Sequence, residues 1–424
     1  MTGGKVQGYP EGFDQRRGAD MNALSTALTG KALPKVQSSC AVPPEFARWR
    51  LPLTASTIGR VQRNGRIAMQ YRQLGRSGLK VSTITMGTMT FGGKSWSKMV
   101  GEVGVDDARR LVDQCRDAGV NLIDTADVYS AGVCEEILGE IIGGPRKNGL
   151  LIATKQRFPM GSGPNDGGSS RHYLISACEA SLRRMKTDVI DVYLLHERDG
   201  VTPIDETMEA LDTLVRQGKV RYVGCSNFSG WHIMKALAAS ERDRRARFVC
   251  QQIHYTLESR DAEYELLPIS IDQGLGVMVW SPLAGGLLSG KHRRNQPTPA
   301  GTRQFAGWTE PPVRDENRLW NIVDALVEIG SSRGVSAAQV ALSWTLGRAG
   351  ITTLVVGGKT KEQFADNLAA ADLVLTGEER ARLDAVSLQP LIYPYWHQLN
   401  ARDRLSEADL LLLAPHLAKA GGTV

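Results

Sequence analysis

The feature that most constrains this chain is an alternation between two kinds of segment. Eight short runs rich in apolar and β-branched residues are separated by segments with the periodicity of amphipathic helices. Near-continuous apolar strands are typical of a parallel sheet that helices cover on both faces. Eight repeats within about 320 residues predict an α/β fold of the (β/α)₈ TIM barrel type rather than a doubly wound open sheet. The runs cover residues 82–87, 120–124, 150–155, 188–196, 220–227, 247–252, 276–281 and 352–358.

Further segments flank or interrupt these repeats. Two short strand-like runs, 71–74 and 79–82, surround a Gly-Arg-Ser-Gly sequence and predict an N-terminal β-hairpin. A polar loop at 284–314 precedes two predicted helices, 316–330 and 336–347, and a loop of this length is more often functional than idle. We therefore predict a barrel over 69–388 and a C-terminal tail over 389–424, with a helix near 406–419.

The first 68 residues have a different character. They contain Gly, Pro, Ser and Thr throughout and no sustained hydrophobic period, which predicts a disordered extension. Ten Lys or Arg and four acidic residues give this segment the whole net charge of +6, because the rest of the chain carries 41 of each kind. Met69 directly precedes the hairpin. We expect either that translation starts there or that the extension is a targeting or interaction arm.

Composition excludes several classes of function. The longest apolar run, 410–414, ends at Pro415 and is far shorter than a membrane span. The six cysteines are scattered without a CxxC pair, so we expect no disulfide framework, no metal site and a reducing, cytoplasmic compartment. The neutral barrel shows no basic patch with interleaved aromatic residues, so nucleic acid is not an expected partner. Nothing in the sequence indicates the oligomeric state.

Polar residues end most of the predicted strands. Because the carboxyl ends of barrel strands meet at one rim, where active sites form, these side chains should lie together. Taken singly, each is more commonly a turn, cap or core residue, but their occurrence on successive strands indicates a site. They are Asp124, Lys155, His196, Ser226, Asn227, Gln252, Trp280 and Ser281, and Tyr129 follows Asp124 in the next loop.

Four of these groups suit proton transfer to a carbonyl. A phenol has an ordinary pKa of about 10, and a neighbouring lysine ammonium would stabilise its phenolate. Asp124 could keep Lys155 charged, and His196 could polarise a carbonyl group. Since no metal-ligand cluster or activated nucleophile accompanies them, the electrons are expected from a hydride cofactor.

The sequence resembles the aldo-keto reductase family from about Tyr71 to Ser387. The motifs that carry the resemblance are DTADVY, ATK, VYLLH, VRYVGCSNFSGW and GGKTKEQFADNL, together with the hairpin. RFPMGSGPNDGG and YPYWHQ carry a narrower resemblance to bacterial aryl-alcohol-dehydrogenase-like members. The resemblance implies a catalytic tetrad of Asp124, Tyr129, Lys155 and His196, with Tyr129 as the proton donor in carbonyl reduction.

The same resemblance implies a cofactor, NADPH with NADH as the alternative, and a small carbonyl substrate. Ser226, Asn227 and Gln252 would bind the nicotinamide carboxamide, and Trp280 would stack on its ring. Other cofactor contacts would come from Ser281, Leu283, Lys359, Gln363 and Asn367, the last three at the adenosine end. The substrate pocket would include Trp96, Arg157, Phe158 and Tyr255.

The sequence departs from the family pattern in three places. Cys134 replaces a Ser or Thr at the start of a helix, which predicts a weaker cap. Gln363 stands where some branches have an arginine for the 2′-phosphate, and the 68-residue extension has no counterpart. The segment GGLLSGKH at 285–292 nearly matches a phosphate-binding loop, but His292 stands where that motif needs Ser or Thr. We interpret it as a loop that closes over the cofactor, with Lys291 assisting.

Two other functions fit the same rim. Lys155 could form a Schiff base, as in barrel aldolases, with Tyr129 moving protons. Channel-regulating β-subunits share the fold, so a redox-sensing regulatory subunit that retains the cofactor is a non-enzymatic alternative.

Overall fold

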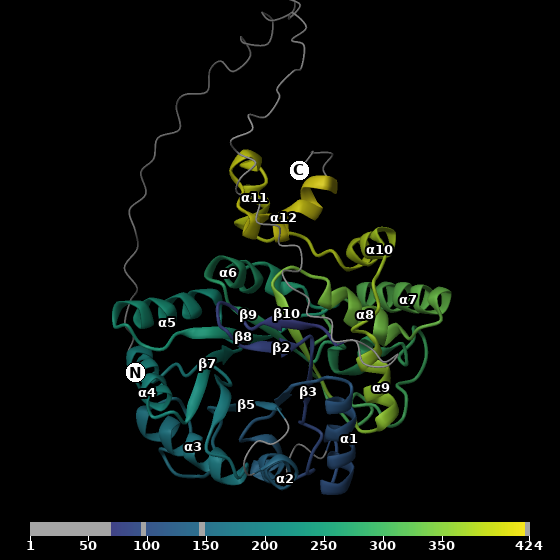
Figure 1. Cartoon of the computed structure of the whole chain (residues 1–424). Coiled ribbons are helices and arrows are strands. Elements are labelled where there is room, and N and C mark those ends of the chain that lie inside the picture. The colour runs from purple at the N-terminus through teal and green to yellow at the C-terminus, as the bar shows by residue number, and fades with distance from the viewer. Residues whose placement is uncertain (1–68, 95–98, 144–148, 420–424) are drawn as a thin grey trace, which may run out of the picture. The chain divides into compact units, whose positions relative to one another are not determined.

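The computed structural model describes residues 69–94, 99–143 and 149–419. Eight parallel strands close into a barrel in the order β10-β3-β4-β5-β6-β7-β8-β9, which confirms the predicted (β/α)₈ architecture (Figure 1). Both faces of each strand are largely buried, as the apolar runs predicted. The strands are β3 Ile84–Gly87, β4 Leu122–Asp124, β5 Leu151–Gln156, β6 Ile190–Leu195, β7 Val220–Ser226, β8 Phe248–His254, β9 Gly276–Trp280 and β10 Ile351–Val356.

Helices surround the barrel and alternate with its strands. Ser336, Thr360 and Thr376 cap three of them by accepting a backbone N–H, and at Thr376 the Glu379 side chain completes a capping box. The barrel helices are α1 Val105–Asp117, α2 Val133–Ile142, α3 Arg171–Arg184, α4 Ile204–Arg216, α5 Gly230–Arg242, α6 Leu266–Gln273, α7 Glu316–Arg333, α8 Ala337–Leu346, α9 Lys361–Ala369 and α10 Gly377–Ser387. Short 3₁₀ turns are η3 Tyr129–Gly132, η4 Asp261–Glu263, η5 Ala284–Ser289 and η6 Arg402–Arg404.

The predicted hairpin forms from β1 (Tyr71–Gln73) and β2 (Lys80–Ser82), which pair antiparallel. Leu74 and Val81 are fully buried in one cluster with side chains from inside the barrel. At Gly75, φ is +62° and an added Cβ would lie 2.2 Å from the Val249 carbonyl oxygen, so only glycine fits. The hairpin therefore closes the end of the barrel where the strands begin.

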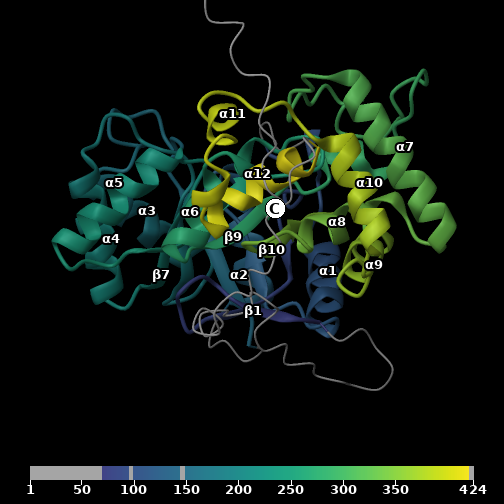
Figure 2. The same ribbon diagram turned by 90° about the horizontal axis from the view of Figure 1, so that it is seen from above.

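The C-terminal tail contains α11 (Tyr395–Gln398) and the predicted helix, observed as α12 (Glu407–Lys419). The Tyr264 hydroxyl donates to the Pro390 carbonyl at 2.8 Å, and the rings of Tyr264 and Tyr395 lie 5.1 Å apart. α12 contacts α6 and buries three leucines, and Figure 2 shows the two helices side by side. The tail thus packs on the barrel beside α6.

Several predictions fall outside this structure. Residues 1–68 and Trp96 lie beyond the described residues. Within the described ranges, no helix has both the length and the apolar character needed to cross a bilayer.

Candidate active site

The predicted tetrad assembles where the strands end. Asp124 is the last residue of β4, Lys155 is the next-to-last residue of β5, and His196 directly follows β6. These three strands are consecutive in the barrel, so their ends are neighbours. Tyr129 begins η3, and the backbone N–H of Asp127 donates to the Lys155 carbonyl, which ties this turn to β5.

Lys155 lies at the centre of the tetrad. Its Nζ donates to Asp124 Oδ2 at 2.7 Å, to the Thr125 carbonyl at 2.8 Å and to the Tyr129 hydroxyl at 3.3 Å. The second carboxylate oxygen of Asp124 accepts from Gln252 Nε2 at 2.8 Å. Lys155 is fully buried, so a charged ammonium is tolerated there because all three protons have partners.

The environment keeps the phenol and the ammonium protonated near neutral pH. Burial raises the pKa of Tyr129 above its ordinary value, and the charge of Lys155 opposes that shift. Burial alone would lower the pKa of Lys155, but Asp124 and Tyr129 raise it overall. Before any ligand binds, Tyr129 is therefore a protonated donor beside a charged lysine.

His196 is held neutral. Burial, followed by the charge of Lys155, lowers its pKa well below the ordinary value. Its ring lies edge-on to Tyr129 with centroids 5.8 Å apart and edge-on to Phe158 at 5.0 Å. Its Nδ1 is buried and has no partner among the described residues. A neutral imidazole beside a phenol can hydrogen-bond a carbonyl oxygen without contributing a net charge.

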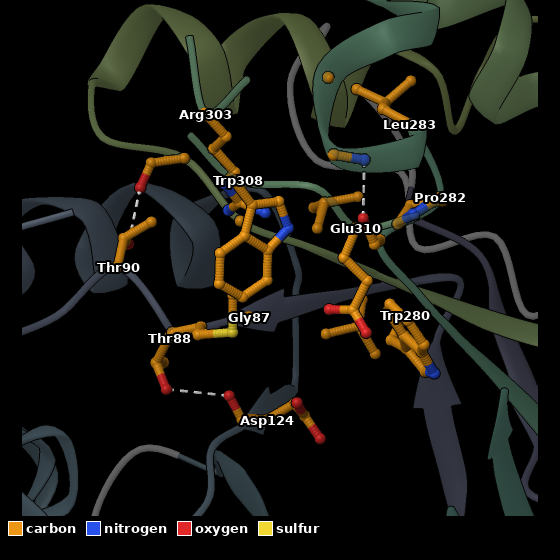
Figure 3. A pocket seen from close by; sticks show the side chains of 18 of the residues that line it. Gly87, Thr88, Thr90, Asp124, Trp280, Pro282, Leu283, Arg303, Trp308 and Glu310 are labelled. Carbon is orange, nitrogen blue, oxygen red and sulfur yellow. Dashed lines mark hydrogen bonds between the residues drawn. The ribbon is translucent and has the colours of Figure 1, made fainter. Parts of the chain in front are cut away.

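The tetrad opens into a large pocket of about 740 Å³ (Figure 3). That volume suits an extended ligand such as a dinucleotide together with a small substrate. Lys155 is not in the wall and reaches the pocket only through its neighbours. The predicted residues that do line it are Asp124, Tyr129, Phe158, His196, Ser226, Asn227, Gln252, Trp280, Ser281, Leu283, Lys359, Gln363 and Asn367.

Residues 83–388, which hold all four tetrad residues, match the model of the aldo/keto reductase family. The chain belongs to the aldo/keto reductase family. It is therefore an NAD(P)-dependent oxidoreductase.

Individual members of the family are similar over most of their length. An uncharacterized oxidoreductase, YrpG of Bacillus subtilis (strain 168), is 40% identical over 321 residues, 73% of this chain and 93% of the relative. A probable voltage-gated potassium channel subunit beta of Oryza sativa subsp. japonica is 35% identical, covering 75% of this chain and 96% of the relative. One from Arabidopsis thaliana is 34% identical, covering 72% and 92%.

The residues expected to bind the carboxamide have unequal hydrogen-bonding capacity. Ser226 Oγ has no hydrogen-bond partner among the described residues although Ser226 is only 1% exposed, so a ligand amide could satisfy it. Asn227 links two neighbours: its Nδ2 donates to the His196 carbonyl at 3.1 Å, and its Oδ1 accepts from Trp280 Nε1 at 3.0 Å. One N–H of the Gln252 amide donates to Asp124, which leaves its second N–H and its oxygen. Each of the three side chains therefore keeps some hydrogen-bonding capacity for a ligand, and that of Ser226 is wholly unused among the described residues.

Trp280 forms a flat wall of the large pocket. The ring of His254 packs against it with centroids 4.6 Å apart and planes inclined by 38°. Burial lowers the pKa of His254 to about 4, so the ring is neutral at neutral pH. Trp280 is thus fixed by Asn227 at its edge and by His254 against its ring.

The opposite end of the pocket is formed by the start of α9. Gln363 Oε1 accepts from the Lys359 N–H at 2.7 Å, and Lys359 is exposed. Asp366 also lines the pocket, but its two oxygens accept from Ser336 Oγ and Gln339 Nε2. A helix N-terminus with a nearby lysine fits a phosphate group.

Three residues of the long loop line the pocket and are not among the predicted site residues. Figure 3 shows Arg303, Trp308 and Glu310 pointing into the pocket from the long loop after β9. No ion pair joins Arg303 to any described residue. The length of the loop was the available signal, but a segment without periodicity does not indicate which of its side chains face inward.

Three expectations need correction. Tyr255 does not line the pocket: it is fully buried, and its hydroxyl donates to Glu263 Oε1 and accepts from Arg348 Nε. Arg157 is also absent from the wall, with its guanidinium 5.5 Å from the Phe158 ring.

Cys134 is not a helix cap, because Gly132 holds that position. The thiol instead contacts the Thr88 carbonyl and the hydroxyls of Thr88 and Thr125. The cysteine at position 134 therefore affects the packing against Thr88 and Thr125 and does not affect the cap of α2.

The segment GGLLSGKH does not have phosphate-loop geometry. It forms η5 with left-handed Gly285 and Gly286, and the next helix, α7, begins only at Glu316. Ser281 Oγ accepts from the Gly285 N–H at 2.9 Å. Lys291 lines the large pocket, and its predicted role beside the cofactor stays a prediction.

Proposed function

We propose that this protein reduces an aldehyde or ketone to the alcohol with NADPH. The observation that carries the proposal is that Tyr129 and His196 line a pocket of about 740 Å³, with the buried Lys155 Nζ 3.3 Å from the Tyr129 hydroxyl. The unpartnered Ser226 hydroxyl supports a bound carboxamide. When bound, the nicotinamide would supply a hydride to the carbonyl carbon.

The residues would divide the remaining work between them. His196 would donate a hydrogen bond to the carbonyl oxygen and orient it toward Tyr129. The Tyr129 hydroxyl would give its proton to that oxygen as negative charge develops. Lys155 would stabilise the resulting phenolate, and Asp124 would keep Lys155 charged. In the reverse direction the same groups would accept the proton.

The choice of NADPH over NADH rests on charge at the α9 end. Lys359 lines the pocket beside the start of α9. Its ammonium fits a phosphate group of a dinucleotide. The carboxylate of α9 in this wall, Asp366, already accepts hydrogen bonds from Ser336 and Gln339.

A carbonyl panel tests this proposal. The purified protein would be mixed with aromatic and aliphatic aldehydes and ketones and either NADPH or NADH, and the loss of reduced-nicotinamide absorbance followed. We expect faster oxidation of NADPH with at least one class of aldehyde. Absence of turnover with every carbonyl, despite measurable NADPH binding, would contradict the reductase assignment.

The Schiff-base alternative is not favoured by the geometry. A lysine must lose its proton to attack a carbonyl, but Lys155 is buried, engaged in three hydrogen bonds and has a raised pKa. Borohydride treatment with substrate should leave the mass of the protein unchanged. A covalent adduct at Lys155 would support an aldolase.

A regulatory role is the second candidate. The similarity to two plant proteins whose names describe potassium channel β-subunits supports it. Such a role predicts very slow turnover and a cofactor that stays bound through purification. Rapid multiple turnover with free exchange of cofactor would contradict it.

A further inference from the structure

A second cavity, of about 170 Å³, lies among the segments that follow β5, β6 and β7. It shares no lining residue with the large pocket. Val201 at its edge is 93% exposed, so the cavity borders solvent. Its lining includes Ser169, Arg198, Asp199, Val201, His232 and Lys235.

Two polar groups in this cavity lack a hydrogen-bond partner among the described residues. Ser169 is only 1% exposed, yet its Oγ bonds to none of those residues. His232 Nδ1 pairs with Ser229 Oγ at 2.6 Å, whereas its buried Nε2 has no partner. Buried hydroxyl and imidazole groups are normally satisfied, so both indicate a missing hydrogen-bonding ligand.

The cavity also has cationic walls. Arg198 and Lys235 line it, with the Arg198 guanidinium 5.6 Å from the Trp231 ring. Burial first, and then these two charges, lower the pKa of His232. α4 begins at Ile204 in the same wall, and no described side chain caps its N-terminus.

One carboxylate, Asp199, lines the cavity, but its oxygens are already occupied. Oδ2 accepts from the Ser169 N–H and the Thr202 hydroxyl, and Oδ1 accepts from the N–H groups of Val201 and Thr202. A lone, saturated carboxylate among donors is unlike the oxygen-rich ligand set of a hard cation. The ligand that matches the remaining groups is an anion.

We propose that this cavity binds a tetrahedral oxoanion, either free phosphate or sulfate or the phosphoryl group of a small metabolite. Arg198 and Lys235 would supply charge, and Ser169 and His232 would supply hydrogen bonds. At about 30 Å³ per water molecule, the volume holds an oxoanion with a few waters. The proposal is independent of carbonyl reduction because the large pocket contributes no residue.

His232 provides a local reporter for the test. The side chains of the seven histidines are observed by ¹H–¹³C NMR in the full chain, and the His232 signal is identified by its loss in His232→Gln. Sodium phosphate is then titrated against sodium chloride at equal ionic strength. We expect a saturable shift of the His232 signal with phosphate only, and a rise in the pKa of His232 when phosphate is bound.

Variants separate this site from general ionic effects. Lys235→Gln should weaken phosphate binding about two- to fivefold, as is typical of an exposed charge. Ser169→Ala should weaken it several-fold by removing a hydrogen bond to a charged ligand. Lys80→Gln, on the hairpin, is the matched control and should have no effect.

The ligand series distinguishes the source of the oxoanion. Saturation by inorganic phosphate and sulfate indicates a free ion, and much tighter binding of glycerol phosphate indicates a phosphorylated metabolite. Equal shifts with phosphate and chloride would overturn the proposal. So would a saturable shift that Lys235→Gln and Ser169→Ala both leave unchanged.

Discussion

The two ends of the large pocket are built on different principles. At the tetrad end, Asp124 and Lys155 are buried and lie on consecutive strands. Lys155 Nζ donates three hydrogen bonds, and each carboxylate oxygen of Asp124 accepts one. At the other end, Lys359 is exposed beside the start of α9. The groups that would carry the chemistry are therefore integral to the core, whereas those that would recognise phosphate can change with little effect on folding.

The largest expected effect is that of removing the buried cation. Lys155→Met leaves the Asp124 charge buried without its partner, so the free energy of unfolding should fall by about 3–5 kcal/mol. Carbonyl reduction should be lost as well. Lys359→Met makes the same substitution at the exposed end and should leave stability unchanged. Urea unfolding of both variants measures the two free energies of unfolding. Equal values would contradict the contrast between the buried and the exposed lysine.

Tyr129→Phe is expected to abolish chemistry without affecting the fold. The ring and its contacts remain, but the proton donor is gone, so the reduction rate should fall by about 100-fold or more. NADPH affinity and melting temperature should stay close to those of the unmodified protein. Retention of more than about a tenth of the rate would assign proton donation to another group.

The burial of His254 against Trp280 should make the free energy of unfolding depend on pH. His254 has a pKa of about 4 in the fold and about 6.5 when unfolded, so the unfolded chain binds the proton first. Its contribution to stability is present above pH 6.5 and lost as the pH falls toward 4, by about 3 kcal/mol in all. His254→Phe keeps a ring against Trp280 and should show a shallower loss of stability over that range. If urea unfolding shows the same loss of stability with falling pH in His254→Phe and in the unmodified protein, His254 is not the cause of that loss.

The smallest effect is expected at the exposed cation. Lys359→Ala should weaken NADPH binding by about three- to tenfold through loss of a charge-assisted contact, and should leave NADH binding unchanged. Isothermal titration with both dinucleotides measures this difference. Equal weakening of both would place the 2′-phosphate away from Lys359.

The strand ends could be predicted from sequence because a barrel gathers them at one rim whatever the details of packing. The positions of Asp124, Lys155 and His196 could be predicted from the order of the strands and the residue at which each strand ends. Side-chain direction beyond a strand end is less constrained, and this explains the error at Tyr255. It follows the last residue of β8, and its hydroxyl meets Glu263 and Arg348 instead of the pocket.

The hydrogen bonds between site residues also could not be predicted from the sequence. Nothing in the motif around Asn227 indicates that both ends of its amide are already bonded within the protein. Arg303 and Glu310 lie in a loop without periodicity, where the direction of each side chain depends on tertiary contacts that local patterns do not encode.

The bonds of Asn227 have a mechanical consequence. The residue adopts a left-handed conformation with φ of 57°, which asparagine tolerates better than most side chains. One end of its amide is attached to the indole that would support the nicotinamide, and the other to the backbone of the imidazole that would align the carbonyl. The hydride donor and the carbonyl that accepts the hydride would therefore both be positioned by residues that Asn227 connects. A displacement of either would be transmitted to the other, so their separation could be kept constant while the surrounding loops change shape to admit different substrates.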